Sequence, residues 1–494
     1  MGKRLPAALV AALSVALVWL GAGTSTGTHQ SDDTASALPE QLRQPNVVLV
    51  LTDDMRADDL RYLPKVNRLL VDQGVRFSNA ISPHPLCCPA RAGLFTGQYA
   101  QNSGVQHNAG AWGGAQALLD RDSNIGAWLT TAGYQTAYHG KFLNGWEEER
   151  WTPAGWTRWD PLVSGIHSYK RGEFLDGDTY EGEYVAGVMS ERSERTIGQL
   201  SRSGAPFLSI INHVAPHVTV VGDNLPDSER KYRRHYRDAK PPWLGTRAFD
   251  ERHVRDLPDD LRFRHVRRGT TIELFRARLR ALRSVDDAVA SLVRRLDRLG
   301  ELDETYIVFT SDNGLGMGEH RADRKNILFD ETLDVPLVVR GPGVPRGRTV
   351  HDLVSLVDLP ATFVDWAGAE PGRPLDGASL AGVLRGRGLD RDTLLVQTGD
   401  ERVNSTPGWN YRGVTTDRFL YGRKIDQPGV GILFDRLRDP LALVNRYGDP
   451  DYRRVQRELE RRTDLLEECS GELLCNRQFG RVPPPRQAVL RRTR

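Results

Sequence analysis

Several stretches of the chain are continuous apolar runs that end in polar side chains. The clearest runs are residues 46–51, 207–211 and 306–310. The polar residues just beyond them are Asp53, Asp54, Asn212, His213, Asp312 and Asn313. Continuous β-branched runs are typical of strands buried on both faces of a parallel sheet. Because open sheets of this kind place ligands at the carboxyl ends of their strands, the pattern predicts an α/β fold with a polar site there.

Helical patterns separate these predicted strands. Apolar residues recur at helical spacing over residues 271–299, and Gly300 suits the end of that helix. A second helix is predicted from Pro89, in its first turn, to Thr96. Residues 223–269 are rich in charge, proline and aromatic side chains, and predict a long irregular segment near the active edge.

The alternation of strands and helices fades after a further apolar run at residues 335–340. Short strands are predicted over residues 394–397, 411–415, 419–424 and 431–434, followed by a charged amphipathic helix over residues 452–468. The fold class is therefore α/β: a large, mostly parallel sheet flanked by helices. A smaller C-terminal α+β domain built on a short antiparallel sheet would begin near Asp390.

The N-terminus has the order of a secretory signal peptide. Lys3 and Arg4 precede an apolar run over residues 7–20, and small residues follow at 21–23. The run is short for a membrane span, so no stable membrane insertion is expected, with an uncleaved anchor as the alternative. We therefore expect the protein to be secreted or otherwise extracytoplasmic.

Charge gives little reason to expect a polyanionic partner for the whole chain. Lys and Arg number 67 against 64 Asp and Glu, a net charge of +3. This balance argues against nucleic acid as a partner. Residues 477–494 are locally basic and contain no acidic residue. They predict a solvated tail, or else a contact to a polyanionic substrate or surface.

The chain has four cysteines, which is few for an exported protein of this size. Cys469 and Cys475 enclose a short loop and can pair in an oxidising compartment, the alternative being two free buried thiols. Cys87 and Cys88 are adjacent in the sequence. Because vicinal disulfides are strained, a different fate is expected for at least one of them.

Oxygen ligands for a hard divalent cation are present at two predicted strand ends. Asp53, Asp54, Asp312 and Asn313 supply carboxylate and amide oxygens, which such cations prefer. Histidines do not cluster at zinc spacing. Each pair alone could simply form a turn. Together with the segment around Cys87, they indicate an oxygen-rich metal site beside a sulfur-derived nucleophile.

These motifs, in this order, resemble the sulfatase family of the alkaline phosphatase superfamily. In that family the first cysteine of a Cys-x-Pro-x-Arg segment is oxidised to formylglycine, and the matching segment here is Cys87-Cys88-Pro89-Ala90-Arg91. The Cys-Cys-Pro opening and Gly140-Lys141-Phe142-Leu143-Asn144 are most similar to N-acetylglucosamine-6-sulfatases. The remaining matches include Ala215-Pro216-His217, Ser311-Asp312-Asn313-Gly314 and Lys325.

The resemblance implies a role for each matching residue. Position 87, matured by a formylglycine-generating enzyme, would provide the hydroxyl that attacks the sulfur of a sulfated sugar or aryl sulfate. Arg91 would steady that group, Lys141 and Lys325 would bind sulfate oxygens, and His217 would be the acid for the departing alcohol. One calcium ion would be held by Asp53, Asp54, Cys87 (as formylglycine), Asp312 and Asn313.

Together with the patterns above, the resemblance divides the chain into five parts. The expected parts are a signal peptide (1–23), a disordered lead-in (24–44), a catalytic sulfatase domain (45–389), a C-terminal subdomain (390–476) and a basic tail (477–494).

Some features depart from the family pattern or leave alternatives open. Leu143 stands where many sulfatases have a histidine near the second hydroxyl of the hydrated formylglycine, and His139 or His107 are the candidates to replace it. Lys325 follows Arg324, so the register of that basic residue is less secure. Two other functions remain open: a phosphonate or phosphate monoester hydrolase of the same superfamily, and a catalytically silent protein that binds sulfated glycans through an unmodified Cys87.

Overall fold

The structure is a computed structural model that describes residues 44–219, 224–400 and 408–486. The predicted signal peptide, nearly all of the predicted lead-in and the end of the predicted tail lie outside the described residues. Within the described residues, no helix is both long and apolar enough to cross a bilayer.

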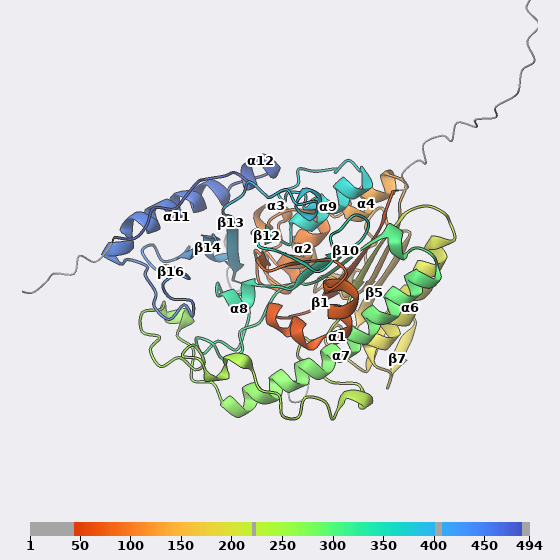
Figure 1. Cartoon of the computed structure of the whole chain (residues 1–494), viewed down its shortest axis with the longest axis horizontal. Helices are drawn as coiled ribbons and strands as arrows, with labels where there is room; N and C mark the ends of the chain where they lie inside the picture. Colours follow the sequence, from red (N-terminus) through yellow and green to blue (C-terminus); the bar gives the residue numbers. More distant parts are fainter. Residues whose placement is uncertain (1–43, 220–223, 401–407, 487–494) are drawn as a thin grey trace, which may run out of the picture. The chain divides into compact units, whose positions relative to one another are not determined.

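A ten-stranded mixed sheet forms the centre of the fold (Figure 1). Its strands, in spatial order, are β11 (Arg348–Val350), β2 (Val75–Phe77), β10 (Leu337–Arg340), β9 (Thr305–Ser311), β1 (Asn46–Thr52), β8 (Phe207–Asn212), β4 (Gln135–Gly140), β5 (Arg158–Ser164), β6 (Arg171–Phe174) and β7 (Thr179–Glu181). The run from β9 to β5 is parallel throughout, whereas β10, β6 and β7 pair antiparallel with their neighbours. The prediction of a large, mostly parallel sheet is confirmed.

The two faces of this sheet bury separate apolar cores because side chains alternate along each strand. In β1, Val47, Leu49 and Leu51 belong to one core, and Val48 and Val50 belong to the other. The first core is closed by α2 (Cys87–Thr96), α4 (Ile125–Thr131), α9 (Asp358–Ala367) and α10 (Ala381–Leu384). The second is closed by α1 (Pro64–Val66), α6 (Val185–Ser201) and α7 (Arg268–Arg298).

The two helices predicted from the sequence are present with small shifts. Helix α7 begins three residues before the predicted start and ends at Arg298. Helix α2 begins at Cys87, two residues before Pro89. Because the first N–H groups of a helix have no partner within it, a proline at the third position costs no hydrogen bond. Gly97, at φ 69°, ends α2 in the left-handed conformation that glycine adopts readily.

Apart from the first two residues of α7 and an isolated β-bridge between Phe249 and Glu319, the described part of the segment predicted to be irregular contains only short 3-10 turns. These are Arg230–Tyr232, Pro242–Gly245 and Asp259–Leu261. Its backbone is tied to the chain that follows β9, since Asp250 N–H donates to the Gly318 carbonyl (2.8 Å). Other short elements include β3 (Ala80–Ile81), β12 (Val354–Ser355), α3 (Ala100–Ser103), α5 (Trp146–Glu149) and α8 (Asp330–Leu333).

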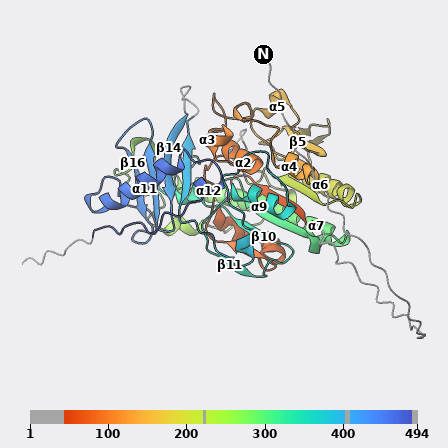
Figure 2. The ribbon, with the colours of Figure 1, turned by 90° about the horizontal axis from the view of Figure 1, so that it is seen from above.

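A separate antiparallel sheet follows in the C-terminal part of the chain, as predicted (Figure 2). Its strands are β13 (Leu394–Gly399), β14 (Trp409–Thr415), β15 (Phe419–Lys424) and β16 (Gly431–Asp435), covered by α11 (Arg453–Leu466). Cys469 and Cys475, next to the short α12 (Glu472–Cys475), form the expected disulfide, with Cα atoms 5.2 Å apart.

The first part of the predicted basic tail is packed rather than free. The backbone N–H groups of Phe479 and Gly480 donate to the carboxylate of Asp392, and Phe479 packs against the apolar core of the C-terminal sheet. Arg462 of α11 donates to the Gly480 carbonyl at 2.6 Å. Residues up to about 486 therefore belong to the folded C-terminal part.

Candidate functional site

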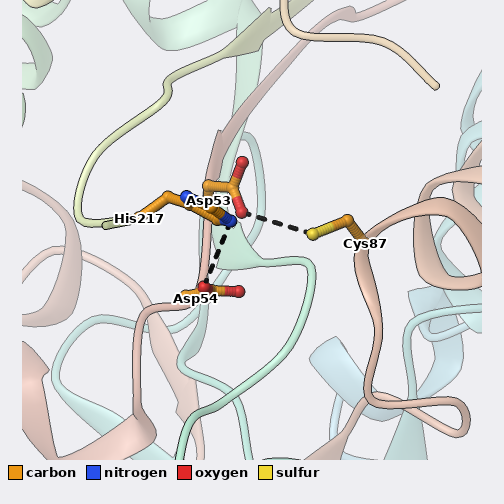
Figure 3. Close-up of side chains that lie close together, drawn as sticks. All are labelled: Asp53, Asp54, Cys87 and His217. Atoms are coloured by element: carbon orange, nitrogen blue, oxygen red, sulfur yellow. Dashed lines mark hydrogen bonds and ion pairs between the residues drawn. The ribbon is translucent and has the colours of Figure 1, made fainter. Parts of the chain in front are cut away.

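The predicted site residues meet where the parallel strands end. Asp53 and Asp54 follow β1, Asp312 and Asn313 follow β9, and Lys141 follows β4. Cys87 opens α2 on the same side, and it lies close to Asp53, Asp54 and His217 (Figure 3). One potential ligand atom from each of these four residues lies within 4.8 Å of the others.

The side chain of Cys87 lies among two ammonium groups and a carboxylate. Its Sγ atom is 2.8 Å from Lys325 Nζ, 3.8 Å from Lys141 Nζ and 3.6 Å from Asp53 Oδ1. Burial raises the pKa of the Cys87 thiol to about 12, in spite of the two lysines. Because the thiolate is the nucleophilic form of cysteine, the unmodified side chain is a poor nucleophile near neutral pH.

Cys88 is directed to different partners. Its Sγ atom accepts a hydrogen bond from the Asn144 N–H at 3.2 Å, and its own N–H donates to Asn108 Oδ1 at 2.8 Å. The buried Cys88 packs in the apolar core between α2 and the sheet. Successive residues of a helix point about 100° apart, so only one cysteine of the pair can face the carboxylates.

Acidic and basic side chains alternate around Cys87. Lys141 Nζ lies 2.5 Å from Asp53 Oδ2, and Lys325 Nζ lies 2.5 Å from Asp54 Oδ1. Arg91, one turn along α2, donates from Nε to Asp312 Oδ2 at 2.9 Å. These three carboxylates and three cations balance in formal charge. Such pairing is necessary because isolated buried charges cost several kcal/mol each.

The charges move the carboxylate pKa values apart. Burial acts to raise the pKa of Asp53, but neighbouring positive charges, that of Lys141 foremost, hold it well below its usual range. For Asp312, burial and the adjacent charge of Asp53 outweigh Arg91 and raise the pKa to about 6. The negative charge is therefore held most firmly at Asp53, beside Cys87.

The oxygen atoms at the ends of β1 and β9 fit a hard divalent cation. The Asn313 amide nitrogen donates to Asp54 Oδ1 (2.7 Å), whereas Asn313 Oδ1 is buried without a hydrogen-bond partner. The Asp54 N–H donates to Asp312 Oδ1 at 3.0 Å, and Arg278 holds the Asp54 carbonyl at 2.6 Å. Asp54 itself has a left-handed φ of 67°, which Asp tolerates better than most residues. Three carboxylates and an orphaned amide oxygen are ligands suited to calcium.

His217 presents one nitrogen to this cluster. Its Nδ1 donates to the Val218 carbonyl (2.6 Å), which leaves Nε2 facing Asp54 Oδ2 at 3.7 Å (Figure 3). Tyr169 Oη donates to the His217 carbonyl at 2.6 Å and fixes its backbone. Burial lowers the pKa of His217 to about 4, although Asp53 and Asp54 act in the opposite direction.

Leu143 does not enter the site, and His139, one proposed substitute for the missing histidine, pairs with an aspartate outside the cluster around Cys87. Leu143 is buried in the apolar core rather than in the site. His139 Nδ1 is 2.9 Å from Asp160 Oδ2, and the same carboxylate is bound by Arg192 of α6. His107 lies beside the buried His84, whose pKa its charge helps to lower.

Sequence reasoning missed one histidine next to the site. His167, in the loop between β5 and β6, stacks against His217 with ring centroids 4.7 Å apart. Burial, and beyond it the charges of Lys141 and His217, lower the pKa of His167 to about 3. No motif or spacing marks His167, because a loop far along the chain brings it to His217. Another buried histidine, His320, has different partners: it pairs with Glu251 and stacks on Phe329.

The comparisons with known proteins agree with this geometry. The sulfatase family model matches residues 45–369, and the model for the C-terminal part of N-sulphoglucosamine sulphohydrolase matches residues 318–468. The chain belongs to the sulfatase family.

Two relatives match most of this chain and different shares of their own length. An extracellular sulfatase SULF-1 homolog of Drosophila melanogaster is 31% identical over 377 residues, which cover 73% of this chain but only 33% of the fly protein. The N-acetylglucosamine-6-sulfatase of Homo sapiens is 30% identical over 388 residues, covering 74% of this chain and 69% of the human protein.

Two solved structures share the fold at lower identity. A protein in complex with its substrate D-glucosamine-2-N,6-O-disulfate aligns at a TM-score of 0.67 and 22% identity, over 85% of this chain and 97% of that chain. The phosphonate monoester hydrolase of Agrobacterium radiobacter aligns at a TM-score of 0.67 and 22% identity, over 84% of this chain and 94% of that chain.

Replacing Arg91 by lysine should disable the site. Lysine keeps the charge but cannot bind two carboxylates in the fixed geometry of a guanidinium group. We expect Arg91→Lys to lower kcat/KM for a sulfate ester by about 100-fold or more. The exposed Arg121→Lys is the matched control and should keep its activity. Near-normal kcat/KM in a folded Arg91→Lys protein would show that the guanidinium group does not organise the site.

Proposed function

We propose that this protein is an exported sulfatase that hydrolyses sulfate monoesters of a sugar such as N-acetylglucosamine 6-sulfate. The observation that carries the proposal is the placement of buried Cys87 between Lys141 and Lys325 and beside Asp53. A thiol with a raised pKa is of little use there as a nucleophile. Its conversion to formylglycine would supply a hydrated aldehyde whose hydroxyl group attacks sulfur.

The chain's own residues would bind and orient the ester. Lys141 and Lys325 would exchange part of their contact with Asp53 and Asp54 for the sulfate oxygens, as point charges that stabilise developing negative charge. The first N–H groups of α2 and the positive end of its dipole favour an anion at Cys87. Arg91 would keep the carboxylates of Asp53 and Asp312 in place throughout.

His217 would deliver the proton to the departing alcohol from Nε2. Its Nδ1 is already committed to Val218, so Nε2 is the nitrogen that exchanges protons. With its lowered pKa, His217 is neutral before substrate binds. It would take up the proton together with the anionic ester, whose charge favours the imidazolium form.

A calcium ion would be held by Asp53, Asp54, Asp312, Asn313 and residue 87. When bound, it would polarise the sulfate oxygens and acidify the attacking hydroxyl. The donor set supports this proposal, because three carboxylates and the orphaned Asn313 Oδ1 offer the oxygen ligands that calcium prefers.

The division of labour along the chain is also proposed. Residues 45–389 would form the catalytic domain, and residues 390–476 the C-terminal subdomain. Hydrogen bonds link the two parts next to the site: Asn326, beside Lys325, donates to the Gly399 carbonyl at the end of β13. Export, with a formylglycine-generating enzyme as the maturation partner, is supported by the N-terminal segment and by the extracellular relatives.

Peptide mass spectrometry on protein from its native host tests the maturation. We expect an aldehyde in place of the thiol at position 87 and an intact Cys88. Cys87→Ala should abolish turnover, whereas Cys88→Ser should retain it, because Cys88 Sγ faces Asn144. Unmodified thiols at both positions would favour the silent glycan-binding alternative, and the reverse pattern of activity would show that the wrong cysteine has been assigned.

Calcium binding should be visible without any turnover. We expect calcium to raise the melting temperature of chelator-treated protein, and to stabilise the fold by about 3 kcal/mol at a hundredfold excess of free calcium over Kd. Asn313→Ala, which removes the orphaned amide oxygen, should weaken this response, whereas Asn410→Ala in β14 should not. An equal response in wild type and Asn313→Ala would place the ion elsewhere.

The choice between sulfur and phosphorus esters needs a direct comparison, since the fold is shared with phosphonate monoester hydrolases. We expect kcat/KM for 4-nitrophenyl sulfate to exceed that for 4-nitrophenyl phosphate and a phenylphosphonate ester. Protein with the aldehyde verified at position 87 should be used for all three substrates. A preference for either phosphorus ester by orders of magnitude would reject the sulfatase proposal.

A further inference from the structure

A cavity of about 560 Å³ opens beside His167, on the side of the hairpin formed by β6 and β7. This volume lies within the range of about 300–1,000 Å³ found for ligand pockets. Its floor is the turn from Ser164 to Ser168, and one wall is the hairpin. His167 belongs to the cavity and also stacks on His217, so the cavity begins next to the residue proposed to meet the leaving group.

The register of the hairpin gives that wall a polar face. Arg171 pairs with Glu181, and Glu173 pairs with Thr179. Residues that pair across strands, and those two apart along a strand, share one face, so these four side chains lie together. All four line the cavity. Phe174 and Tyr180 alternate with these residues and are buried in the second apolar core, where Tyr180 also forms part of the cavity lining beside Gly172.

The backbone beneath the cavity is fitted closely to the hairpin. A Cβ atom at Gly165 would come within 2.4 Å of the Arg171 carbonyl oxygen, and one at Gly172 within 2.7 Å of the Tyr180 ring. Gly165 also has a φ of 74°, a conformation that other residues rarely adopt. The shape of the cavity therefore depends on glycine at both positions.

The polar face has the chemistry of a sugar site with an acidic bias. Carboxylates accept, and guanidinium groups donate, hydrogen bonds to neighbouring hydroxyl groups. Glu173 and Glu181 outnumber Arg171, so the face carries an excess of negative charge. A carboxylate or second sulfate on a bound sugar would meet like charge there, and such juxtaposition costs affinity.

We propose that this hairpin cavity binds the sugar unit attached to the sulfated residue, and that it selects an uncharged, hydroxyl-rich unit over a uronate. The inference rests on the proposed sulfatase function and deepens it. His167 forms the border between the two regions: the sulfate ester lies on the His217 side and the neighbouring sugar on the hairpin side. The carboxylates and cations around Cys87 balance in formal charge, so the excess negative charge that would select between the sugars lies on the hairpin.

Two disaccharides test the selection. In both, 6-sulfated N-acetylglucosamine is linked to a second sugar, which is galactose in one and glucuronate in the other. We expect wild-type enzyme to show a higher kcat/KM for the galactose-linked substrate. Glu181→Lys should lower the ratio of kcat/KM for the galactose-linked substrate to kcat/KM for the glucuronate-linked substrate at least tenfold. Glu181→Gln should lower it about threefold, because each change removes a negative charge that faces the uronate.

Glu183→Lys is the matched control. Glu183 is exposed, lies two residues beyond Glu181 and does not line the cavity. Its substitution by lysine therefore makes the same change in net charge outside the proposed site. We expect it to change the ratio less than twofold. Equal kcat/KM values for the two disaccharides in wild type, or equal effects of Glu181→Lys and Glu183→Lys on their ratio, would overturn the cavity proposal.

Hydrolysis of 4-nitrophenyl sulfate separates this outcome from failure of the proposed function. That substrate has no sugar to occupy the cavity, and its turnover reports whether each variant is folded and matured. Wild-type enzyme that hydrolyses it but does not discriminate between the disaccharides would refute the cavity alone. Fully matured wild type that hydrolyses no sulfate ester would refute the function on which the cavity depends.

Discussion

The site depends on mutual neutralisation of charges that are removed from water. Asp53, Asp54 and Asp312 are buried within a few ångströms of one another, and each is held by a cation that is buried or, in the case of Lys325, largely buried. Removing any one cation would leave an uncompensated buried charge, which is far more costly than replacing a complete pair by apolar groups. Since the pairs come from different elements, the charges can be brought together only when the whole sheet edge is assembled.

The fold brings these charges together through ordinary properties of a parallel sheet. Strands that run in one direction end at one edge, so β1, β9 and β4 deliver their terminal side chains to the same region. Helix α2 adds its N-terminus at the same edge, where unpaired N–H groups favour anions. The acidic strand ends therefore need cations, whereas the helix end attracts the substrate anion. Lys141 and Lys325 lie between the two and contact both Asp and Cys87 side chains.

Much of this arrangement could be predicted from local sequence patterns, whereas the rest depends on contacts between residues far apart in the chain. The apolar runs predicted β1, β8 and β9 because strands buried on both faces tolerate few polar residues, and the cysteine spacing predicted the disulfide. The first position of α2 could not be read from Pro89, since proline is accepted at several early helical positions. The choice of Lys325 over Arg324 became clear only from the contact with Asp54. His167 has no local signal at all, because its neighbour His217 lies far along the chain.

The same contacts bear on the missing histidine at position 143. In the chain's own fold, Leu143 packs with Phe142 and Trp146 in an aromatic-rich core, so a polar side chain there would be buried without a partner. His139 is bound by Asp160, which Arg192 also neutralises, and that network serves the packing of α6 on the sheet. The imidazole that does contact His217 comes from the β5–β6 loop. That loop also lines the hairpin cavity. The loop that contacts His217, the proposed acid, is therefore also the loop that would contact the neighbouring sugar.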